Sequence, residues 1–224
     1  MRITGGVQAL LLDLDGTLAD TAPDMAGALN ALLAEEERPA LPFDLIRPWV
    51  SHGAWALVRL GFGESLAETR RADLRERFLG HYQAAICCGT RLFNGFDAIL
   101  EMADRRGMPW GIVTNKPGWL TAPLVEALNL AQRAGVVVSG DTLARAKPHP
   151  DPLLHAAAVI GRAPGSCVYV GDAARDIEAG RAAGMTTVAA AWGYIPSTED
   201  PVHWEADHVA SAPSDLHEFV FGGS

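Results

Sequence analysis

The sequence predicts an α/β fold: a Rossmann-like, doubly wound parallel sheet core with a small all-helical cap domain inserted after the first strand. Two observations predict this fold class. Short apolar runs recur along the chain and several end at acidic or hydroxyl residues, as buried parallel strands do where they open into a ligand crevice. A long stretch after the first run has helical periodicity and no β-branched runs. The predicted core comprises residues 1–19 and 89–224, and the predicted cap comprises residues 20–88.

The first predicted strand is the apolar run at residues 10–12, which ends at the carboxylates Asp13 and Asp15. Because α/β sheets bind ligands at the carboxyl ends of their strands, Asp13 is a candidate nucleophile and Asp15 a candidate general acid and base. Gly16 permits an unusual backbone turn, and Thr17 adds a hydroxyl and amides beside a phosphate. Taken alone, a pair of carboxylates at this spacing is more often an acidic turn.

The cap is predicted to begin with a helix. Thr21 is the predicted N-cap residue, with Pro23 and Asp24 in the first turn. The apolar face of this helix carries Met25, Ala28, Leu29, Leu32 and Leu33. A second helical stretch spans about residues 65–88, and the α/β pattern resumes near Leu92.

The apolar run at residues 110–113 predicts a second parallel strand, which ends at Thr114 and Asn115. These two side chains should therefore open into the same crevice as Asp13. Thr114 would hydrogen-bond a phosphoryl oxygen, and Asn115 would orient the nucleophile or the substrate. Asn115 alone would more often be a turn residue.

Lys147 is the candidate cation of the site. It precedes a proline, and residues 150–160 then predict a helix with proline in its first turn. Beside Asp13, Lys147 would lower the pKa of that carboxyl and neutralise charge in the pentavalent state. The alternative is a solvated surface lysine.

A third apolar run, at residues 166–170, ends at a second acidic pair, Asp172 and Asp176. If a helix starts just after Asp172, Asp176 lies in its first turn and can face Asp172. Mg²⁺ prefers oxygen ligands in octahedral geometry, so these carboxylates, the Asp15 backbone carbonyl and a phosphate oxygen predict a magnesium site. Asp176 fits equally well as a first-turn carboxylate that stabilises a helix.

These four motifs, in this order, resemble the haloacid dehalogenase superfamily of phosphohydrolases over nearly the whole chain. The resemblance implies that Asp13 attacks phosphorus to give an aspartyl phosphate. It implies that Asp15 protonates the leaving alkoxide and later activates water. Dehalogenation would not need an acid at this position. Thr114 would bind the phosphoryl group, and Lys147 would hold the nucleophile and the phosphate.

The resemblance also implies a metal site for Mg²⁺. Its ligands would be Asp13, the backbone carbonyl of Asp15 and Asp172. Asp176 would complete the site as an outer carboxylate that fixes Lys147 or a metal-bound water.

The loop at residues 48–53 is the most site-like part of the cap. In related phosphatases the loop at this position dips toward the substrate, so Ser51, His52 and the amide of Gly53 are candidates for binding a carboxylate or a sugar. The alternative is that Trp49 and Trp55 are core residues and His52 is a solvated loop histidine.

The C-terminal part narrows the expected substrate. Gly193 and Tyr194 follow a predicted strand at residues 186–189, a pattern similar to phosphoglycolate phosphatases. The longer pattern through residues 201–204, together with residues 114–117, is more similar to N-acetylmuramic acid 6-phosphate phosphatases. The sequence therefore predicts a phosphomonoesterase for one of these esters. The alternatives are a phosphosugar phosphatase or a phosphomutase of the same superfamily and, from a different class, a non-catalytic phosphoacceptor signalling domain.

Composition sets the expected partners. A net charge of −9 and no evident basic patch disfavour nucleic acid and anionic membranes as partners. The resemblance implies a small-molecule phosphate ester as the partner. No apolar run approaches the length of a membrane span, and residues 1–6 lack a signal-peptide core, so we expect a cytoplasmic protein. The sequence does not fix the oligomeric state, and the expected alternatives are a monomer and a homodimer. Cys87, Cys88 and Cys167 are expected to be reduced packing residues.

Overall fold

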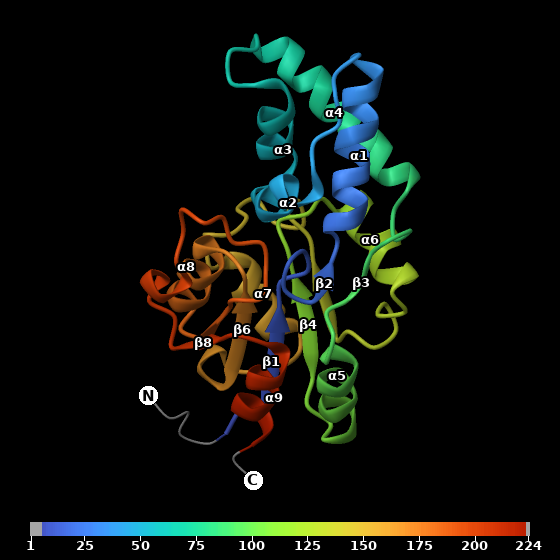
Figure 1. The fold of residues 1–224 in the computed structure, drawn as a ribbon. Helices are drawn as coiled ribbons and strands as arrows, with labels where there is room; N and C mark the ends of the chain where they lie inside the picture. Colours follow the sequence, from blue (N-terminus) through green and yellow to red (C-terminus); the bar gives the residue numbers. More distant parts are fainter. Residues whose placement is uncertain (1–5, 223–224) are drawn as a thin grey trace.

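The computed structural model describes residues 6–222 of the 224-residue chain. Its centre is a six-stranded parallel sheet with the strand order β5-β4-β1-β6-β7-β8 (Figure 1). This confirms the predicted doubly wound α/β fold. The strands are β1 (Ala9–Leu12), β4 (Trp110–Val113), β5 (Val136–Val138), β6 (Cys167–Gly171), β7 (Thr186–Ala190) and β8 (His208–Ala210).

Strand β1 lies in the middle of the sheet and is buried on both faces, which explains its unbroken apolar sequence. Leu10 and Leu12 point to one face, and Ala9 and Leu11 point to the other. The first face packs against α5 (Phe96–Arg105), α6 (Gly118–Ala127) and α9 (Pro213–Phe221). The second packs against α7 (Asp151–Val159) and α8 (Ala174–Ala182).

A helical segment between β1 and β4 stands above the carboxyl ends of the strands (Figure 1). It has a hydrophobic core of its own, in which Leu29 and Leu32 share a cluster with Phe78 and Tyr82. A two-stranded antiparallel ribbon, β2 (Ala19–Asp20) with β3 (Arg91–Leu92), joins its two connections to the body. The helices of the segment are α1 (Ala22–Glu35), α2 (Phe43–Ile46), the 3-10 helix η1 (Arg47–His52), α3 (Gly53–Phe62) and α4 (Glu68–Ala84).

All of these helices lie within the predicted cap range of 20–88, and the division into two domains stays a prediction. The strand predicted at 110–113 is confirmed, and the one predicted at 166–170 is shifted by one residue. The helix predicted at 150–160 is confirmed as α7. The expectation about residues 1–5 lies outside the described residues.

Two local predictions are corrected. Thr21 does precede α1, but its side chain makes no capping hydrogen bond and donates instead to Asp15. The three cysteines form no disulfide, and Cys167 is a packing residue because it is buried. Cys88 is exposed, so the prediction that it packs in the interior is wrong.

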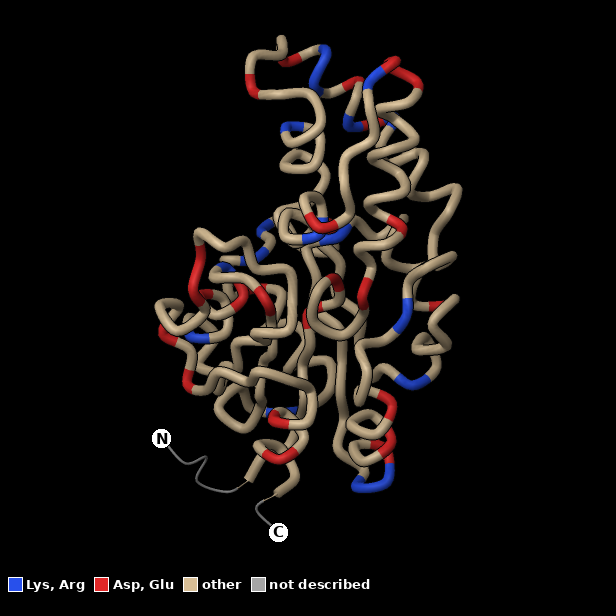
Figure 2. Tube along the Cα trace, in the orientation of Figure 1, with Lys and Arg blue, Asp and Glu red and all other residues tan. Residues whose placement is uncertain are grey.

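Acidic and basic residues are interspersed over the body and the helical segment (Figure 2). Within residues 6–222, no helix combines the length and the apolar character that a membrane crossing requires.

Asp24, in the first turn of α1, anchors the chain where it returns from the helical segment. Its buried carboxylate accepts hydrogen bonds from the Gly89 amide at 2.6 Å, the Thr90 amide at 3.0 Å and the Thr90 hydroxyl at 2.6 Å. These three bonds join the two connections between the helical segment and the body.

We expect Asp24→Ala to lower the free energy of unfolding by about 2–4 kcal/mol, because it leaves buried donors without an acceptor. Urea unfolding measures this change. Asp97→Ala is the matched control, since Asp97 is an exposed carboxylate in the first turn of α5 and shares the helix-dipole effect without these bonds. An equal loss in both variants would contradict the anchoring role.

Candidate active site

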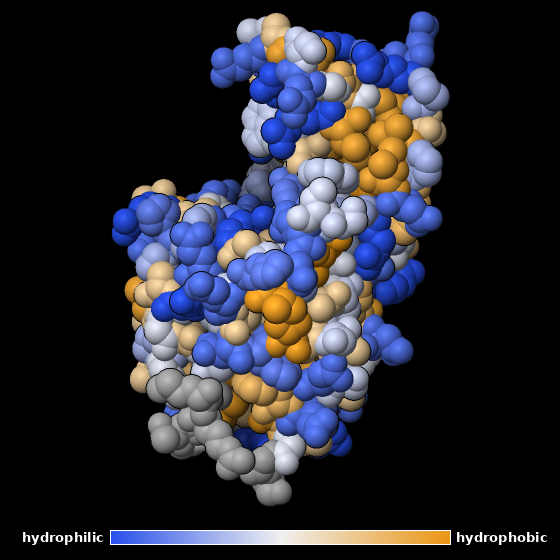
Figure 3. All heavy atoms as spheres, turned by 60° about the vertical axis from the view of Figure 1, so that its left-hand side comes forward, coloured by the Kyte–Doolittle hydropathy of each residue, from blue (hydrophilic) through white to orange (hydrophobic). Residues whose placement is uncertain are grey.

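A cleft of about 350 Å³ lies between the carboxyl edge of the sheet and the helical segment. In the space-filling view, the helical segment overhangs a notch in the surface of the body (Figure 3). The predicted site residues that line the cleft are Asp13, Asp15, Thr114 and Asn115 from the body and Ser51, His52 and Gly53 from the helical segment. Segments far apart in the sequence thus meet here, as predicted for the switch point of such a sheet.

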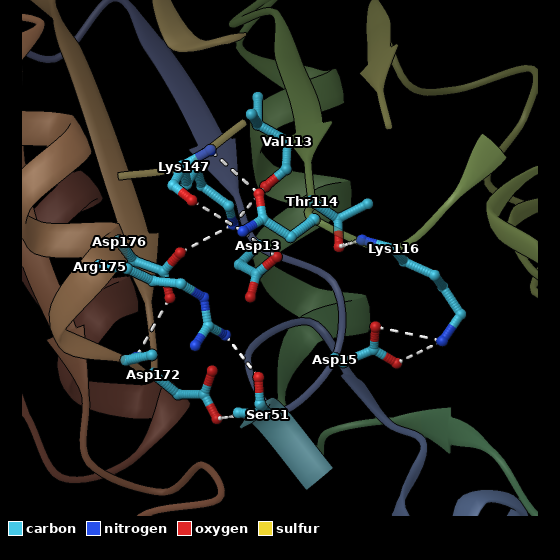
Figure 4. A network of polar contacts seen from close by, with 12 residues as sticks. Asp13, Asp15, Ser51, Val113, Thr114, Lys116, Lys147, Asp172, Arg175 and Asp176 are labelled. Carbon is cyan, nitrogen blue, oxygen red and sulfur yellow. Dashed lines mark hydrogen bonds and ion pairs between the residues drawn. The ribbon is translucent and has the colours of Figure 1, made fainter. Parts of the chain in front are cut away.

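Lys147 is the buried cation at the floor of the site (Figure 4). Its Nζ atom lies 2.9 Å from Asp13 Oδ1 and 2.7 Å from Asp176 Oδ1. It also donates to the Val113 carbonyl at 2.9 Å and to the Tyr169 hydroxyl at 2.7 Å. The predicted neighbourhood of Lys147 and Asp13 is therefore present, and the solvated alternative is wrong.

The pKa of Asp13 is set by opposing effects of its surroundings. Burial raises the pKa of this carboxyl, and Lys147 opposes the effect without reversing it, while the nearby Asp176 carboxylate adds to it. The predicted effect of Lys147, a lowering of the Asp13 pKa, is confirmed, but desolvation at the end of β1 outweighs it and the net pKa is raised.

Three carboxylates form a group that could hold a cation: oxygens of Asp13, Asp172 and Asp176 all lie within 4.8 Å of one another. Asp172 Oδ1 is buried and has no hydrogen-bond partner among the described residues. Burial, together with the charges of Asp13 and Asp176, raises the pKa of Asp172 to about 7. A hard divalent cation would relieve both the crowded charge and the orphaned oxygen, so the residues present fit such an ion.

Asp176 has little coordination capacity left. One of its oxygens pairs with Lys147, and the other accepts a hydrogen bond from the Ala173 amide at 3.1 Å, within the first turn of α8. Asp176 therefore makes the contacts of both interpretations of the sequence. It is a first-turn carboxylate that caps α8, and it also pairs with Lys147.

Gly16 is required where the chain passes under Asp172. Its φ is +83°, and a Cβ atom there would lie 2.0 Å from Asp172 Oδ2. Thr17 is different: it is fully buried and does not line the cleft, and its carbonyl accepts a hydrogen bond from the Trp192 indole. Thr17 Oγ1 is buried without a hydrogen-bond partner among the described residues, and its role beside a phosphate stays a prediction.

Asn115 and Thr114 both line the cleft. Asn115 also contacts the backbone of Lys147, which the sequence did not indicate. Its side-chain oxygen accepts from the Lys147 amide at 3.1 Å, and its Nδ2 donates to the Lys147 carbonyl at 2.9 Å. This reciprocal pair holds the backbone of Lys147 beside the end of β4. Thr114 Oγ1 accepts from the Lys116 amide at 3.2 Å.

The predicted cap loop, residues 48–53, reaches the site through Ser51, whose hydroxyl donates to Asp172 Oδ2 at 2.6 Å. The Tyr194 amide donates to the same oxygen at 2.8 Å. His52 Nε2 lies 3.1 Å from Glu199 Oε1, so this imidazole is paired rather than merely solvated. Trp55 is 46% exposed and lines the cleft, so its interpretation as a core residue is wrong.

Asp15 faces a different set of partners from Asp13, as Figure 4 shows. Its carboxylate accepts from the Thr21 hydroxyl at 2.6 Å and from Lys116 Nζ at 2.9 and 3.2 Å. The side chain of Asp15 therefore lies outside the three-carboxylate group, and only its backbone carbonyl stays a predicted metal ligand.

Lys116 is a functional candidate that the sequence analysis missed. Its side chain is buried, and its ammonium lies 4.4 Å from the ring centroid of Tyr82 on α4. Burial lowers the pKa of Lys116, but the Asp15 carboxylate outweighs it and the pKa is raised, so the side chain stays charged. The only signal in the sequence was its position next to Thr114 and Asn115.

Arg175 was also missed, although it lies between the predicted ligands Asp172 and Asp176. It lines the cleft, and its Nη2 donates to the Ser51 carbonyl at 2.6 Å. Arg175 thereby joins the first turn of α8 to the cap loop.

A carboxylate at the end of a central parallel strand, a buried lysine and a group of carboxylates that could hold a cation together suit the transfer of a phosphoryl group. Residues 10–190 match the family model for haloacid dehalogenase-like hydrolases. The chain belongs to the haloacid dehalogenase-like hydrolase family. It is an enzyme of the phosphatase type, as the following relatives indicate.

The relatives are similar over nearly their whole length. A phosphoglycolate phosphatase of Xanthomonas campestris pv. campestris is 46% identical, over 94% of this chain and 95% of the relative. An N-acetylmuramic acid 6-phosphate phosphatase of Pseudomonas aeruginosa is 39% identical, over 94% of this chain and 93% of the relative. A crystal structure of a predicted phosphoglycolate phosphatase from Haemophilus somnus 129PT superposes with a TM-score of 0.83 at 26% identity, over 96% of this chain and 97% of that one.

We expect Lys116→Met to lower kcat/KM for phosphate-ester hydrolysis by about 10- to 100-fold, because Asp15 loses the cation that orients it. Arg133→Met is the control, because it removes a cation that pairs with a carboxylate, Asp104, away from the cleft. Steady-state kinetics measure both variants. Unchanged kinetics in Lys116→Met would show that Asp15 does not depend on this contact.

We expect Asp172→Asn to stabilise the metal-free protein by about 1–3 kcal/mol, because it removes one of three crowded carboxylates. The asparagine oxygen can still accept from Ser51 and the Tyr194 amide. We also expect Mg²⁺ to raise the melting temperature of the wild type, and the same change should abolish that rise. Differential scanning calorimetry with Mg²⁺ or EDTA measures both effects, and a variant that Mg²⁺ stabilises as strongly as the wild type would contradict the role of Asp172.

Proposed function

We propose that this chain is a Mg²⁺-dependent phosphomonoesterase that acts through an aspartyl-phosphate intermediate on a small phosphorylated carboxylic acid. The observation that carries the proposal is the position of Asp13. It follows the central strand directly, lines the cleft, and lies 2.9 Å from the buried Lys147 ammonium. A carboxylate fixed in this way is a nucleophile with a counter-charge already in place.

In the first half of the reaction, a carboxylate oxygen of Asp13 attacks phosphorus, and the bond from phosphorus to the ester oxygen breaks. Asp15 donates its proton to the departing alkoxide, which leaves as an alcohol. In the second half, Asp15 takes a proton from water while that water attacks the aspartyl phosphate. Inorganic phosphate leaves, and both carboxyl groups return to their starting states.

The other residues supply charge and orientation. Lys147 would contact the phosphoryl group as well as Asp13, and Thr114 would donate a hydrogen bond to it. Asp13, Asp172 and the Asp15 carbonyl would hold Mg²⁺, with Asp176 acting through Lys147. The bound ion would neutralise negative charge on the carboxylates and on the phosphoryl oxygens.

For the substrate we propose 2-phosphoglycolate or N-acetylmuramic acid 6-phosphate, because these esters are in the names of the relatives at 46% and 39% identity. Each ester carries both a phosphate group and a carboxylate group. A cytoplasmic location and a monomeric or homodimeric state remain predictions from the sequence.

We expect Asp13→Asn to reduce turnover at least about 1,000-fold while the melting temperature changes little, since the amide keeps the shape but is a poor nucleophile. Asp15→Asn should instead slow the decay of the phosphoenzyme, because the water that attacks it loses its base. Acid quenching after mixing with a radiolabelled ester detects the phosphoenzyme. Wild-type turnover in Asp13→Asn, or an unchanged phosphoenzyme lifetime in Asp15→Asn, would contradict the assigned roles.

We expect phosphate release from one of the two esters in Mg²⁺, and its loss in EDTA. A malachite green assay of both esters, side by side, compares their kcat/KM values, with Asp13→Asn as the blank. Net phosphate release excludes the phosphomutase alternative, whereas retention of phosphate as a bisphosphate would support it. No release from either ester would contradict the proposed substrate class.

A further inference from the structure

One face of α4 forms a wall of the cleft. Arg75, Leu79 and Tyr82 all line it, and their spacings of four and three residues place them on one side of a helix. Tyr82 is at the chemical end of this face, because its ring contacts Lys116, the partner of Asp15. Arg75 lies two turns away, toward the start of the helix.

Arg75 differs from the other arginines of α4. Among residues 6–222 it has no ion pair, and its Nε is buried without a hydrogen-bond partner. Its guanidinium rests over the ring of Trp55, 5.0 Å from the centroid. Arg70 and Arg77 pair with carboxylates, and Arg71 donates from Nη2 to two backbone carbonyls although its Nε, like that of Arg75, has no partner among the described residues.

A half-buried guanidinium without an acceptor loses hydration that nothing in the cleft replaces. A carboxylate restores it well, because its two oxygens match the fork of the guanidinium. Stacking on Trp55 limits the orientations of the Arg75 plane, so less side-chain freedom is lost when an anion binds. The chemistry of Arg75 therefore points to a carboxylate on the ligand.

The distance between Arg75 and the Tyr82 end of the cleft sets a minimum length for a ligand that reaches both. Seven residues of α helix separate Arg75 from Tyr82, which corresponds to about 10 Å along the axis. Side chains on a helix also lean toward its N-terminus, so Arg75 leans away from Asp15 rather than toward it. In 2-phosphoglycolate the carboxyl carbon is only two bonds from the ester oxygen. A hexose 6-phosphate with an acidic substituent places its carboxylate across the sugar ring instead.

The wall between the two ends suits such a ring. Met25, Leu79 and Leu120 line the cleft with apolar surface and contribute no charge. A sugar ring presents C–H groups to such surface while its phosphate and carboxylate reach the polar ends.

We propose that Arg75, held against Trp55, binds a carboxylate on the far side of a sugar-sized leaving group, and so selects a phosphorylated sugar acid over a two-carbon acid. This inference rests on the proposed function, since it assumes that phosphate esters are cleaved at Asp13. It makes Arg75 a specificity-determining residue rather than a catalytic one.

The test uses three esters with the full-length protein in Mg²⁺. N-acetylmuramic acid 6-phosphate carries the distant carboxylate, N-acetylglucosamine 6-phosphate has the same ring without it, and 2-phosphoglycolate has the carboxylate close to the ester. Arg75→Met should lower kcat/KM for the first ester about 10- to 100-fold, mainly through KM, and change the other two by less than about 2-fold. Arg75→Lys should recover part of the loss.

Arg70→Met is the matched control, because it removes the same charge from the same helix at a solvent-exposed position that pairs with Glu36 and Asp73. Its kinetics should match the wild type on all three esters. The rate of Arg75→Met on N-acetylglucosamine 6-phosphate also shows whether that variant folds.

Equal losses on all three esters, or no loss on N-acetylmuramic acid 6-phosphate, would overturn the role of Arg75. A loss confined to 2-phosphoglycolate would overturn the argument from distance. If the wild type releases no phosphate from any ester, p-nitrophenyl phosphate included, the proposed function itself fails and the inference fails with it. Activity on p-nitrophenyl phosphate together with an unaffected Arg75→Met variant would overturn the inference alone.

Discussion

The site depends on the buried ammonium of Lys147. Asp13 and Asp176 are both buried, and two carboxylates in such a place would be strongly unfavourable without a cation between them. The other contacts of Lys147 are the last carbonyl of β4 and the Tyr169 hydroxyl of β6. One charge thus joins the ends of three neighbouring strands and the first turn of α8.

Asp13 and Asp15 are two residues apart and yet have separate environments. Asp13 lies in a buried group of carboxylates around Lys147, whereas Asp15 is bound by Lys116 and Thr21 on the other side of the turn. Different surroundings are how two similar carboxyl groups come to have different chemical roles. Gly16 makes the separation possible, because only a residue without a Cβ fits under Asp172 there.

The helical segment is part of the site and does more than shield it. Ser51 contacts Asp172, Tyr82 contacts Lys116, and Arg75 faces the far end of the cleft. Chemistry at the sheet edge is common to many phosphate esters, so discrimination among them has to come from the segment that faces the leaving group. The position of the segment is in turn tied to the body by Asp24.

The sequence by itself determined the features that depend on neighbouring residues. Strands β1, β4 and β6 and the polar residues that follow them could be predicted, because a buried strand and its end are local patterns. The short strands β5 and β8, with three residues each, carry too little pattern to be recognised. Only the tertiary structure decided that Lys116 pairs with Asp15, 101 residues away, and that Arg75 lies over the Trp55 ring with no ion pair among the described residues. Pairings across such separations depend on how elements pack, and no local spacing encodes them.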